Sequence, residues 1–228
     1  FGPKSRSLMS RLSSDDFSNE NFKFATSKVI KISSKEIWTQ RLSYVGELGF
    51  ELYIKMKDSK EIYNLIVDKG KEFKLSHCGM FAMDTMRMEK GYLHWGHDMS
   101  PEENQYEAGL DFAISYKKGV NFIGKDAILK IKNQKPKKKL VILSLKNSKP
   151  GFPLLLHDEP ILFNGKIIGR TTSGNYSFTF KKNMSFGYVS TDKKLDDGNI
   201  EIEVEKMKYK AIIETKPLHD PKNIIMKS

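Results

Sequence analysis

The sequence predicts an α+β region followed by a small antiparallel β-barrel domain. In the first 135 residues, alternating apolar runs typical of strands precede two segments with helical apolar spacing. From residue 138 onward, short β-branched runs are separated by turn dipeptides such as Asn164-Gly165. A Lys-rich linker at residues 134–138 separates the two patterns, so we place the domains at residues 1–135 and 138–228.

The elements of the first region follow from apolar spacing and from turn residues. Helices are expected at residues 3–12, after Asp58 as N-cap, and from about Cys78 to Lys90, where Gly91 ends the helix. Strands are expected at residues 22–24, 29–32, 37–44 and 50–54, the last two as a hairpin. Within residues 50–54 the apolar side chains share one face, which leaves Glu51 and Tyr53 on the other.

The second region has the pattern of a barrel. A short helix is expected at residues 122–129, and strands at residues 140–145, 154–156, 161–163, 166–169, 185–189, 200–204 and 209–213. Asn164-Gly165 and Asp197-Gly198 are the expected hairpin turns. The hydroxyl-rich run Thr171 to Tyr176 is interpreted as a polar turn.

The charge distribution argues against nucleic acid and membrane partners. The 228 residues carry a net charge of +11, and the basic residues are 34 Lys and only five Arg. Proteins that recognise nucleic-acid bases and phosphates specifically rely mainly on Arg. A solvated lysine surface fits better, and its positive field would attract a polyanionic small molecule. No apolar run is long enough to span a bilayer, and the start lacks the order of a secretory signal.

The single cysteine and the histidines suggest no metal site. Cys78 has no partner for a disulfide, so we expect a buried apolar thiol and a reducing compartment. His94 and His97 have no third ligand at a recognisable spacing, so a polar, aromatic loop beside a pocket is the favoured interpretation.

Two charged side chains are candidates for ligand recognition. Glu51 can accept two parallel N–H bonds from a guanidine-like edge, although an alternating Glu on a strand is commonly just solvated. Arg87 either pairs with Asp84 or Glu89 or clamps an anionic or carbonyl group. The stripe formed by Met80, Phe81, Met83 and Met86 is interpreted as core packing.

Several stretches resemble one known family in the same order along the chain. Residues 1–6 resemble its Gly-Pro-Lys helix start, residues 41–52 its Tyr-Thr-Gly-Glu-x-Gly-(aromatic)-Glu signature, and residues 83–91 its Asp-Thr-Leu-Arg-Leu-Glu-x-Gly helix. Further landmarks match at residues 107–112, 122–125, 172–174, 186–189 and 217–221. The chain thus resembles the folate-binding one-carbon transferases that include the glycine cleavage T-protein (aminomethyltransferase). Residues 43–49 and 91–98 look most like the C-terminal half of sarcosine and dimethylglycine dehydrogenases.

The resemblance implies a partial aminomethyltransferase-like fold with a ferredoxin-like layer and a C-terminal barrel. It also implies transfer of an amine-borne one-carbon unit to N5 of tetrahydrofolate, which gives 5,10-methylenetetrahydrofolate. In that site Glu51 would hold the pterin edge, and Tyr44 and Arg87 would line the tetrahydrofolate site. The family's catalytic Asp lies upstream of the Gly-Pro-Lys helix, so that role falls on no residue here, and Asp98 does not match it.

The resemblance gives the expected partners, and composition gives the expected compartment. The missing initiator Met suggests a start inside a longer polypeptide, and the dehydrogenase branch carries an upstream flavin domain. The chain itself has no Gly-x-Gly-x-x-Gly dinucleotide motif. A Lys, Ile and Asn enrichment favours a bacterial cytoplasm over a mitochondrial matrix.

Two other functions stay open. One is a folate-dependent demethylation on the same fold, because the sequence does not contain the donor site. The other is a non-catalytic module that binds an anion or another partner through its lysines.

Overall fold

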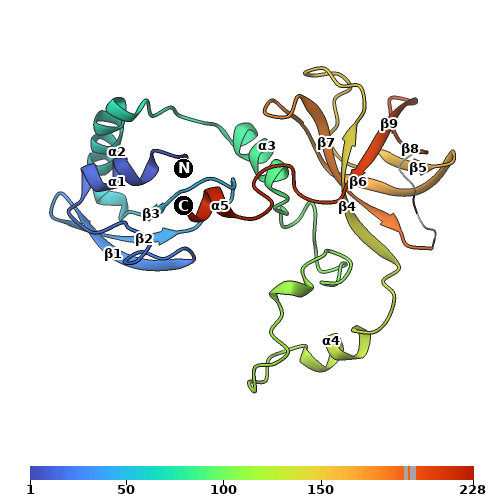
Figure 1. Cartoon of the computed structure of the whole chain (residues 1–228), viewed down its shortest axis with the longest axis horizontal. Coiled ribbons are helices and arrows are strands. Elements are labelled where there is room, and N and C mark those ends of the chain that lie inside the picture. Colours follow the sequence, from blue (N-terminus) through green and yellow to red (C-terminus); the bar gives the residue numbers. More distant parts are fainter. Residues whose placement is uncertain (193–194, 196–198) are drawn as a thin grey trace. The chain divides into compact units, whose positions relative to one another are not determined.

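The chain forms two compact units in a computed structural model that describes residues 1–192, 195 and 199–228 (Figure 1). The first unit contains residues 1–92 together with residues 219–228, and the second contains residues 93–218. The chain therefore leaves the first unit, builds the second, and returns to the first for its last ten residues.

The first unit is built on a three-stranded antiparallel sheet. Strands β1 (Thr26–Ile32), β2 (Lys35–Arg41) and β3 (Glu51–Tyr53) lie in the order β1-β2-β3. Helices α1 (Ser5–Leu12) and α2 (Met56–Gly70) pack on one face of this sheet, where Ile30, Ile37 and Ile62 are fully buried. The apolar side chains of residues 50–54 join this core, which confirms the alternation predicted for that strand.

Helices α3, η1 and α5 also belong to the first unit. Helix α3 (Met80–Lys90) ends as predicted at Gly91, whose φ of 79° is the left-handed value that glycine adopts without strain. The 3-10 helix η1 (Lys71–Phe73) follows α2, and the short α5 (Ile224–Lys227) lies in the returning segment. The three-stranded sheet and its helices thus form the predicted α+β layer.

The second unit contains a closed antiparallel barrel, which confirms the predicted fold. Its six strands are β4 (Lys138–Leu145), β5 (Pro160–Phe163), β6 (Lys166–Ser177), β7 (Lys182–Ser190), β8 (Ile200–Val204) and β9 (Met207–Glu214). They close in the order β4-β7-β6-β5-β8-β9 around a core that includes Leu143, Ile161 and Ile202. Asn164 and Gly165, both with positive φ, form the expected two-residue turn between β5 and β6.

The segment before the barrel carries η2 (Asp111–Ala113) and α4 (Lys125–Ile131). Asp98 joins this segment to the barrel, since its fully buried carboxylate accepts hydrogen bonds from the hydroxyls of Thr172 (2.6 Å) and Ser173 (2.7 Å). The Tyr188 hydroxyl donates to the Asp98 carbonyl oxygen at 2.9 Å. Asp98 is thus a structural anchor of the second unit.

Some predicted elements are wrong, and each error has a local cause. Residues 22–24 form no strand, because the Phe22 ring turns into the core against Phe17 and Phe50. Residues 154–156 form no strand either. Their apolar pattern has another cause, because Leu155 is buried in the barrel core while Leu154 and Leu156 are exposed. Asp58 lies inside the first turn of α2 and is not its N-cap.

Two further expectations concern the barrel. The run Thr171 to Tyr176 is part of β6 and not a turn. The hydroxyls of Thr171 and Ser173 donate to the carboxylates of Glu159 and Asp98, and a bulge between Thr171 and Ser173 keeps β6 paired with β7. The predicted turn at Asp197-Gly198 lies outside the described residues.

Two predictions of burial are also wrong. Met80 and Phe81 are 73% and 87% exposed, so the apolar stripe of α3 is not core at its N-terminal end, and the buried turn of that helix is its last one. Cys78, just before α3, is exposed.

The barrel core gives a stability prediction. Leu143 is fully buried, so Leu143→Ala should lower the free energy of unfolding by about 2–5 kcal/mol in a urea titration. Ile167→Ala removes a 70% exposed side chain on β6 and should change it by less than about 0.5 kcal/mol. Equal losses for the two variants would contradict the assignment of Leu143 to the core.

Candidate functional site

Glu51 lies at the start of β3 on the face of the sheet opposite to α1 and α2. It pairs with Gln40 of β2, and its side chain is half-buried. The Tyr53 hydroxyl donates a hydrogen bond to Glu51 Oε2 at 3.0 Å, and this bond to a carboxylate raises the pKa of Tyr53. Glu51 Oε1 has no hydrogen-bond partner among the residues that the structure describes. One carboxylate oxygen is thus fixed and the other is available.

The neighbours of Glu51 on this face are aromatic. Trp38 of β2 pairs with Tyr53 of β3, and the two rings lie 4.6 Å apart between centroids. Trp38 is 44% exposed and Tyr53 is 46% exposed, so each keeps ring surface for a ligand. We call the face formed by Val29, Glu36, Trp38, Gln40, Glu51 and Tyr53 the outer sheet face.

The loop of residues 44–50, which leads into Glu51, is held tightly at its glycine. Gly46 has a φ of 78°, and a Cβ atom there would lie 2.7 Å from Lys90 and 3.0 Å from His219. Val45 and Leu48 on either side are buried. Only glycine satisfies both the backbone angle and the close packing at position 46.

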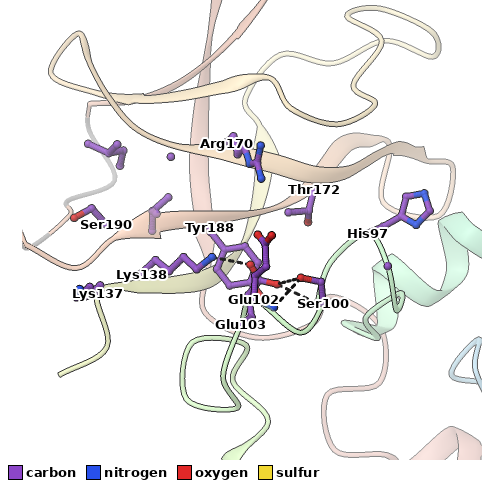
Figure 2. A pocket seen from close by; sticks show the side chains of 14 residues that line it. His97, Ser100, Glu102, Glu103, Lys137, Lys138, Arg170, Thr172, Tyr188 and Ser190 are labelled. Carbon is purple, nitrogen blue, oxygen red and sulfur yellow. Dashed lines mark hydrogen bonds and ion pairs between the residues drawn. The ribbon is translucent and has the colours of Figure 1, made fainter. Parts of the chain in front are cut away.

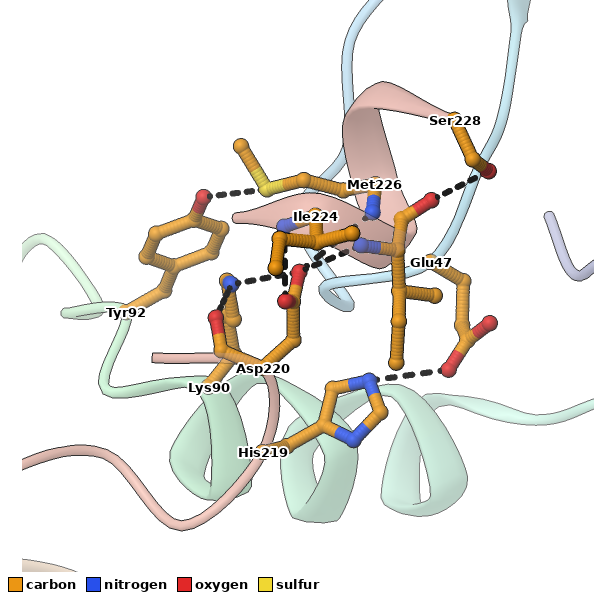
Figure 3. A network of polar contacts seen from close by, with 9 residues as sticks. Glu47, Lys90, Tyr92, His219, Asp220, Ile224, Met226 and Ser228 are labelled. Carbon is orange, nitrogen blue, oxygen red and sulfur yellow. Dashed lines mark hydrogen bonds and ion pairs between the residues drawn. The ribbon is translucent and has the colours of Figure 1, made fainter. Parts of the chain in front are cut away.

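A polar network ties this loop to α3 and to the returning segment (Figure 3). The Lys90 ammonium donates to the Asp220 carbonyl oxygen at 2.5 Å and lies 3.2 Å from its carboxylate, and both side chains are almost fully buried. His219 Nε2 lies 2.9 Å from Glu47 Oε1 without hydrogen-bond geometry, so this contact is an ion pair only when the imidazole is protonated.

Asp220 is the centre of the network. Burial works against its charge, but three backbone N–H donors of residues 224–226 and the Lys90 ammonium outweigh that effect, so the pKa of Asp220 lies below its ordinary value. The same three bonds cap α5, and the carbonyl oxygen of Glu89 accepts from the backbone N–H of His219 at 2.9 Å.

Tyr44 and Arg87 meet at one residue, Tyr92. The rings of Tyr44 and Tyr92 are stacked with centroids 6.3 Å apart, and Arg87 donates from Nη1 to the Tyr92 carbonyl oxygen at 3.1 Å. Arg87 Nε also donates to Asp84 at 2.7 Å, which is one of the ion pairs expected from the sequence. The Arg87 side chain is 1% exposed, so it supports the site from within the protein.

Sequence reasoning missed several residues that shape this site. Trp38 was not placed beside Glu51, although the alternation of residues 36–40 against residues 51–53 carries that signal. His219 and Asp220 belong to a matched motif near the end of the chain, but nothing in their spacing indicates contact with residues 46–47 or with α3.

A separate hollow of about 380 Å³ lies on the barrel unit (Figure 2). The polar side chains around it include His97, which fits the predicted polar loop beside a pocket, together with Arg170, Thr172 and Tyr188. Two of its cations are paired: Lys138 lies 2.6 Å from Glu103 in the same lining, and Arg170 lies 3.2 Å from Asp158, which is not a lining residue. Burial and nearby carboxylates raise the pKa of Tyr188.

The described residues contain neither a metal-binding cluster nor a membrane-spanning helix. In that part of the chain no three His, Cys, Asp or Glu side chains gather in a way that could hold a metal ion, and the rings of His94 and His97 stack on each other at 4.4 Å. None of the helices described is long and apolar enough to cross a bilayer.

Family models match both regions of the chain. The GCVT N-terminal domain matches residues 1–118, and the glycine cleavage T-protein C-terminal barrel domain matches residues 138–220. The chain belongs to the glycine cleavage T-protein family.

Relatives of two kinds are similar to this chain. Human mitochondrial dimethylglycine dehydrogenase is 36% identical over 95% of this chain, which corresponds to 25% of that enzyme. The 4-methylaminobutanoate oxidase (formaldehyde-forming) of Paenarthrobacter nicotinovorans is 36% identical over 97% of this chain and 26% of its own length. The aminomethyltransferase of Symbiobacterium thermophilum is 33% identical over 94% of this chain and 56% of its own length. The chain thus spans about a quarter of the first group and about half of the second.

One solved structure shares the fold. The glycine cleavage system aminomethyltransferase T from Bartonella henselae superimposes with a TM-score of 0.81 over 95% of this chain and 57% of its own, at 20% identity.

The buried Lys90–Asp220 pair yields a second stability prediction. Lys90→Met leaves the Asp220 carboxylate buried without its cation, so the free energy of unfolding should fall by about 3–5 kcal/mol. Lys139→Met, on an exposed residue of β4, should change it by less than about 0.5 kcal/mol. The double variant Lys90→Met/Asp220→Asn should lose less than the sum of its two single changes, and strict additivity in urea titrations would contradict the coupling.

Asp220 also gives a prediction of pH dependence. Because its folded-state pKa is depressed below the ordinary 3.8, it contributes stability that is present above that pH and is lost as the pH falls through the folded-state pKa. Asp220→Asn should therefore be less stable at neutral pH, and the difference from the parent protein should shrink as the pH falls below about 4. A difference that stays constant in urea titrations over this range would contradict the assigned shift.

Proposed function

We propose that this chain is the tetrahydrofolate-binding module of a one-carbon (aminomethyl) transferase. It would form 5,10-methylenetetrahydrofolate from an amine-borne one-carbon unit, as in glycine, sarcosine or dimethylglycine catabolism. Support comes from membership of the glycine cleavage T-protein family and from relatives named aminomethyltransferase and dimethylglycine dehydrogenase.

The observation that carries this proposal is the half-free carboxylate of Glu51. A reduced pterin presents two parallel N–H donors, its ring N–H and its 2-amino group, and a carboxylate accepts such a pair. This role is supported by the Tyr53 hydrogen bond to Oε2, which orients the carboxylate, and by the lack of a hydrogen-bond partner for Oε1 among the described residues. Hydrogen bonds to a charged group contribute about 1.5–3 kcal/mol each, which is enough to orient the ligand.

Tyr44 and Arg87 are the other residues proposed for the site. Tyr44 lies in the loop that leads into Glu51 and would add an aromatic wall, and Arg87 would hold Tyr92, against which Tyr44 stacks. Tetrahydrofolate supplies the nitrogen N5 that accepts the one-carbon unit. The work of this chain is then to bind and orient, and such proximity can supply roughly 7–11 kcal/mol of a reaction barrier.

The site for the donor amine, the catalytic carboxylate and a flavin domain would belong to other parts of a longer polypeptide. In the dehydrogenase branch of the family, an upstream flavin domain would generate the iminium that the folate module receives. A cytoplasmic location goes with this proposal.

Glu51→Gln tests the proposed function. The amide keeps the shape but replaces a charged acceptor and presents an N–H to the pterin donors, so tetrahydrofolate should bind at least tenfold more weakly in a calorimetric titration. Glu20→Gln, an exposed control with the same charge change, should bind like the parent protein. Equal affinity of Glu51→Gln and Glu20→Gln would remove the basis of the proposal.

The rival interpretation as a general anion binder predicts a different result. Binding through the lysine surface would be insensitive to Glu51→Gln and would collapse between low and moderate salt. The folate-dependent demethylase shares the Glu51 contact, so the identity of the amine donor separates it from the transferase.

A further inference from the structure

The loop of residues 44–50 joins two residues of the candidate site. Tyr44 is its first residue, and Glu51 follows its last residue at the start of β3, on the outer sheet face. All residues of the loop are described, and none of them belongs to a helix or strand. The carbonyl oxygen of Leu48 accepts a hydrogen bond from the backbone N–H of Gly2 at 2.8 Å. Side-chain contacts therefore decide where the rest of the loop lies, and with it the spacing of Tyr44 and Glu51.

Glu47 is the charged residue of this loop, and its carboxylate faces His219 of the returning segment (Figure 3). Glu47 Oε1 lies 2.9 Å from His219 Nε2, and each side chain is 18% exposed. Nε2 is buried and makes no hydrogen bond to any group that the structure describes. A buried polar atom without a partner needs a physical reason, and the adjacent carboxylate supplies one when the ring is protonated. The imidazolium can then bind Glu47 by a charge-assisted hydrogen bond.

The charges around His219 do not balance while its ring is neutral. One ammonium group, that of Lys90, stands with two carboxylates, those of Glu47 and Asp220. Lys90 and Asp220 are almost fully buried and lie 3.2 Å apart, so they neutralise each other. A proton on His219 supplies a second positive charge at the place where the Glu47 carboxylate lies.

The end of α3 adds two more titratable residues. Glu89 meets His219 through its carbonyl oxygen, which accepts from the backbone N–H of His219 at 2.9 Å. The pKa of Tyr92 is raised by burial first and by the Asp220 carboxylate second, so its hydroxyl stays neutral at neutral pH. Neither residue places a further cation beside Glu47.

The amino group of Phe1 is the other titratable cation that acts on Glu47. Burial lowers the pKa of this amino group, against the opposing charges of Cys78 and Glu47. A test of the contact between Glu47 and His219 must therefore separate the imidazole from this amino group.

We propose that Glu47 and His219 are positioning residues, and that protonation of His219 fixes the loop which presents Tyr44 and Glu51 to the ligand. This inference rests on the proposed function, because the two residues that the loop carries are those assigned to tetrahydrofolate. It makes ligand binding depend on pH. Histidine ordinarily changes its charge between about pH 5 and 8, so the loop is held more firmly at the acidic end of this range and less firmly as the pH rises.

A double-mutant cycle tests the contact without a ligand. His219→Gln, Glu47→Gln and the double variant are compared with the parent protein in urea titrations at about pH 5.5 and about pH 8. The effect of the Phe1 amino group on Glu47 is present with and without His219, so it cancels in the cycle. The coupling should change the unfolding constant at least about threefold at the lower pH and less at the higher pH. No coupling, or the same coupling at both, would overturn the proposal.

Tetrahydrofolate binding tests the positioning role. In calorimetric titrations of the full chain, His219→Gln should bind about threefold to tenfold more weakly than the parent protein at about pH 5.5, and like it at about pH 8. Comparison at one pH removes the titration of the ligand itself. The control His157→Gln removes an exposed histidine that also lies 2.9 Å from a carboxylate, that of Asp158, and should bind like the parent protein at both.

Proton uptake is a readout that a merely structural role would not change. Calorimetry in two buffers with different ionisation enthalpies counts the protons bound together with the ligand. Near neutral pH the parent protein should take up part of a proton on binding, because a firmly held loop favours the imidazolium. His219→Gln should lose this uptake and His157→Gln should keep it, and an equal uptake in all three proteins would contradict the proposal.

The outcomes separate the positioning role from the proposed function. If His219→Gln binds like the parent protein at both pH values, or loses the same factor at both, the positioning role is wrong, while weaker binding by Glu51→Gln still supports the folate site. If Glu51→Gln leaves tetrahydrofolate binding unaffected, the proposed function itself fails, and the role of the loop in folate binding fails with it. A loss in His219→Gln at the lower pH only, with weaker binding by Glu51→Gln at both, supports the two together.

Discussion

The buried ion pair between Lys90 and Asp220 is the interaction on which the first unit depends. It joins the last turn of α3 to residues 219–228, and the stem of Lys90 fills the space beside Gly46. A charge pair with this little exposure is costly to form, and it persists because the carbonyl oxygen and three backbone N–H groups satisfy the remaining hydrogen-bonding positions. The loop that leads into Glu51 is thereby held by a contact made more than 120 residues later in the sequence.

Much of the fold could be predicted from sequence because strand alternation, helix ends and tight turns depend on neighbouring residues. The alternation around Glu51, the glycine at the end of α3 and the Asn164-Gly165 turn each follow from backbone preference and burial, and each is found in the structure. The errors arise where a side chain serves a distant partner. Thr172 and Ser173 resemble turn residues, but their hydroxyls serve Asp98, and the Phe22 ring joins an aromatic core that no spacing near it indicates.

The candidate site was predictable only in part for the same reason. Glu51 could be placed on the polar face of its strand, whereas Trp38 enters the site through strand register, which depends on pairing across a loop. The pairing of Arg87 with Asp84 needs only helical spacing. In contrast, the contact between His219 and Glu47 could not be predicted, because it forms only when residues 219–228 return to the first unit.

The return of residues 219–228 to the first unit makes the barrel an insertion between two parts of one unit. During synthesis α3 leaves the ribosome long before Asp220 does. The Lys90 ammonium therefore stays solvated, without its partner Asp220, until the barrel residues have been synthesised. Domains generally fold as units in the order in which they emerge. The barrel is therefore free to fold first, and the nascent first unit acquires its final packing only when residues 219–228 leave the exit tunnel.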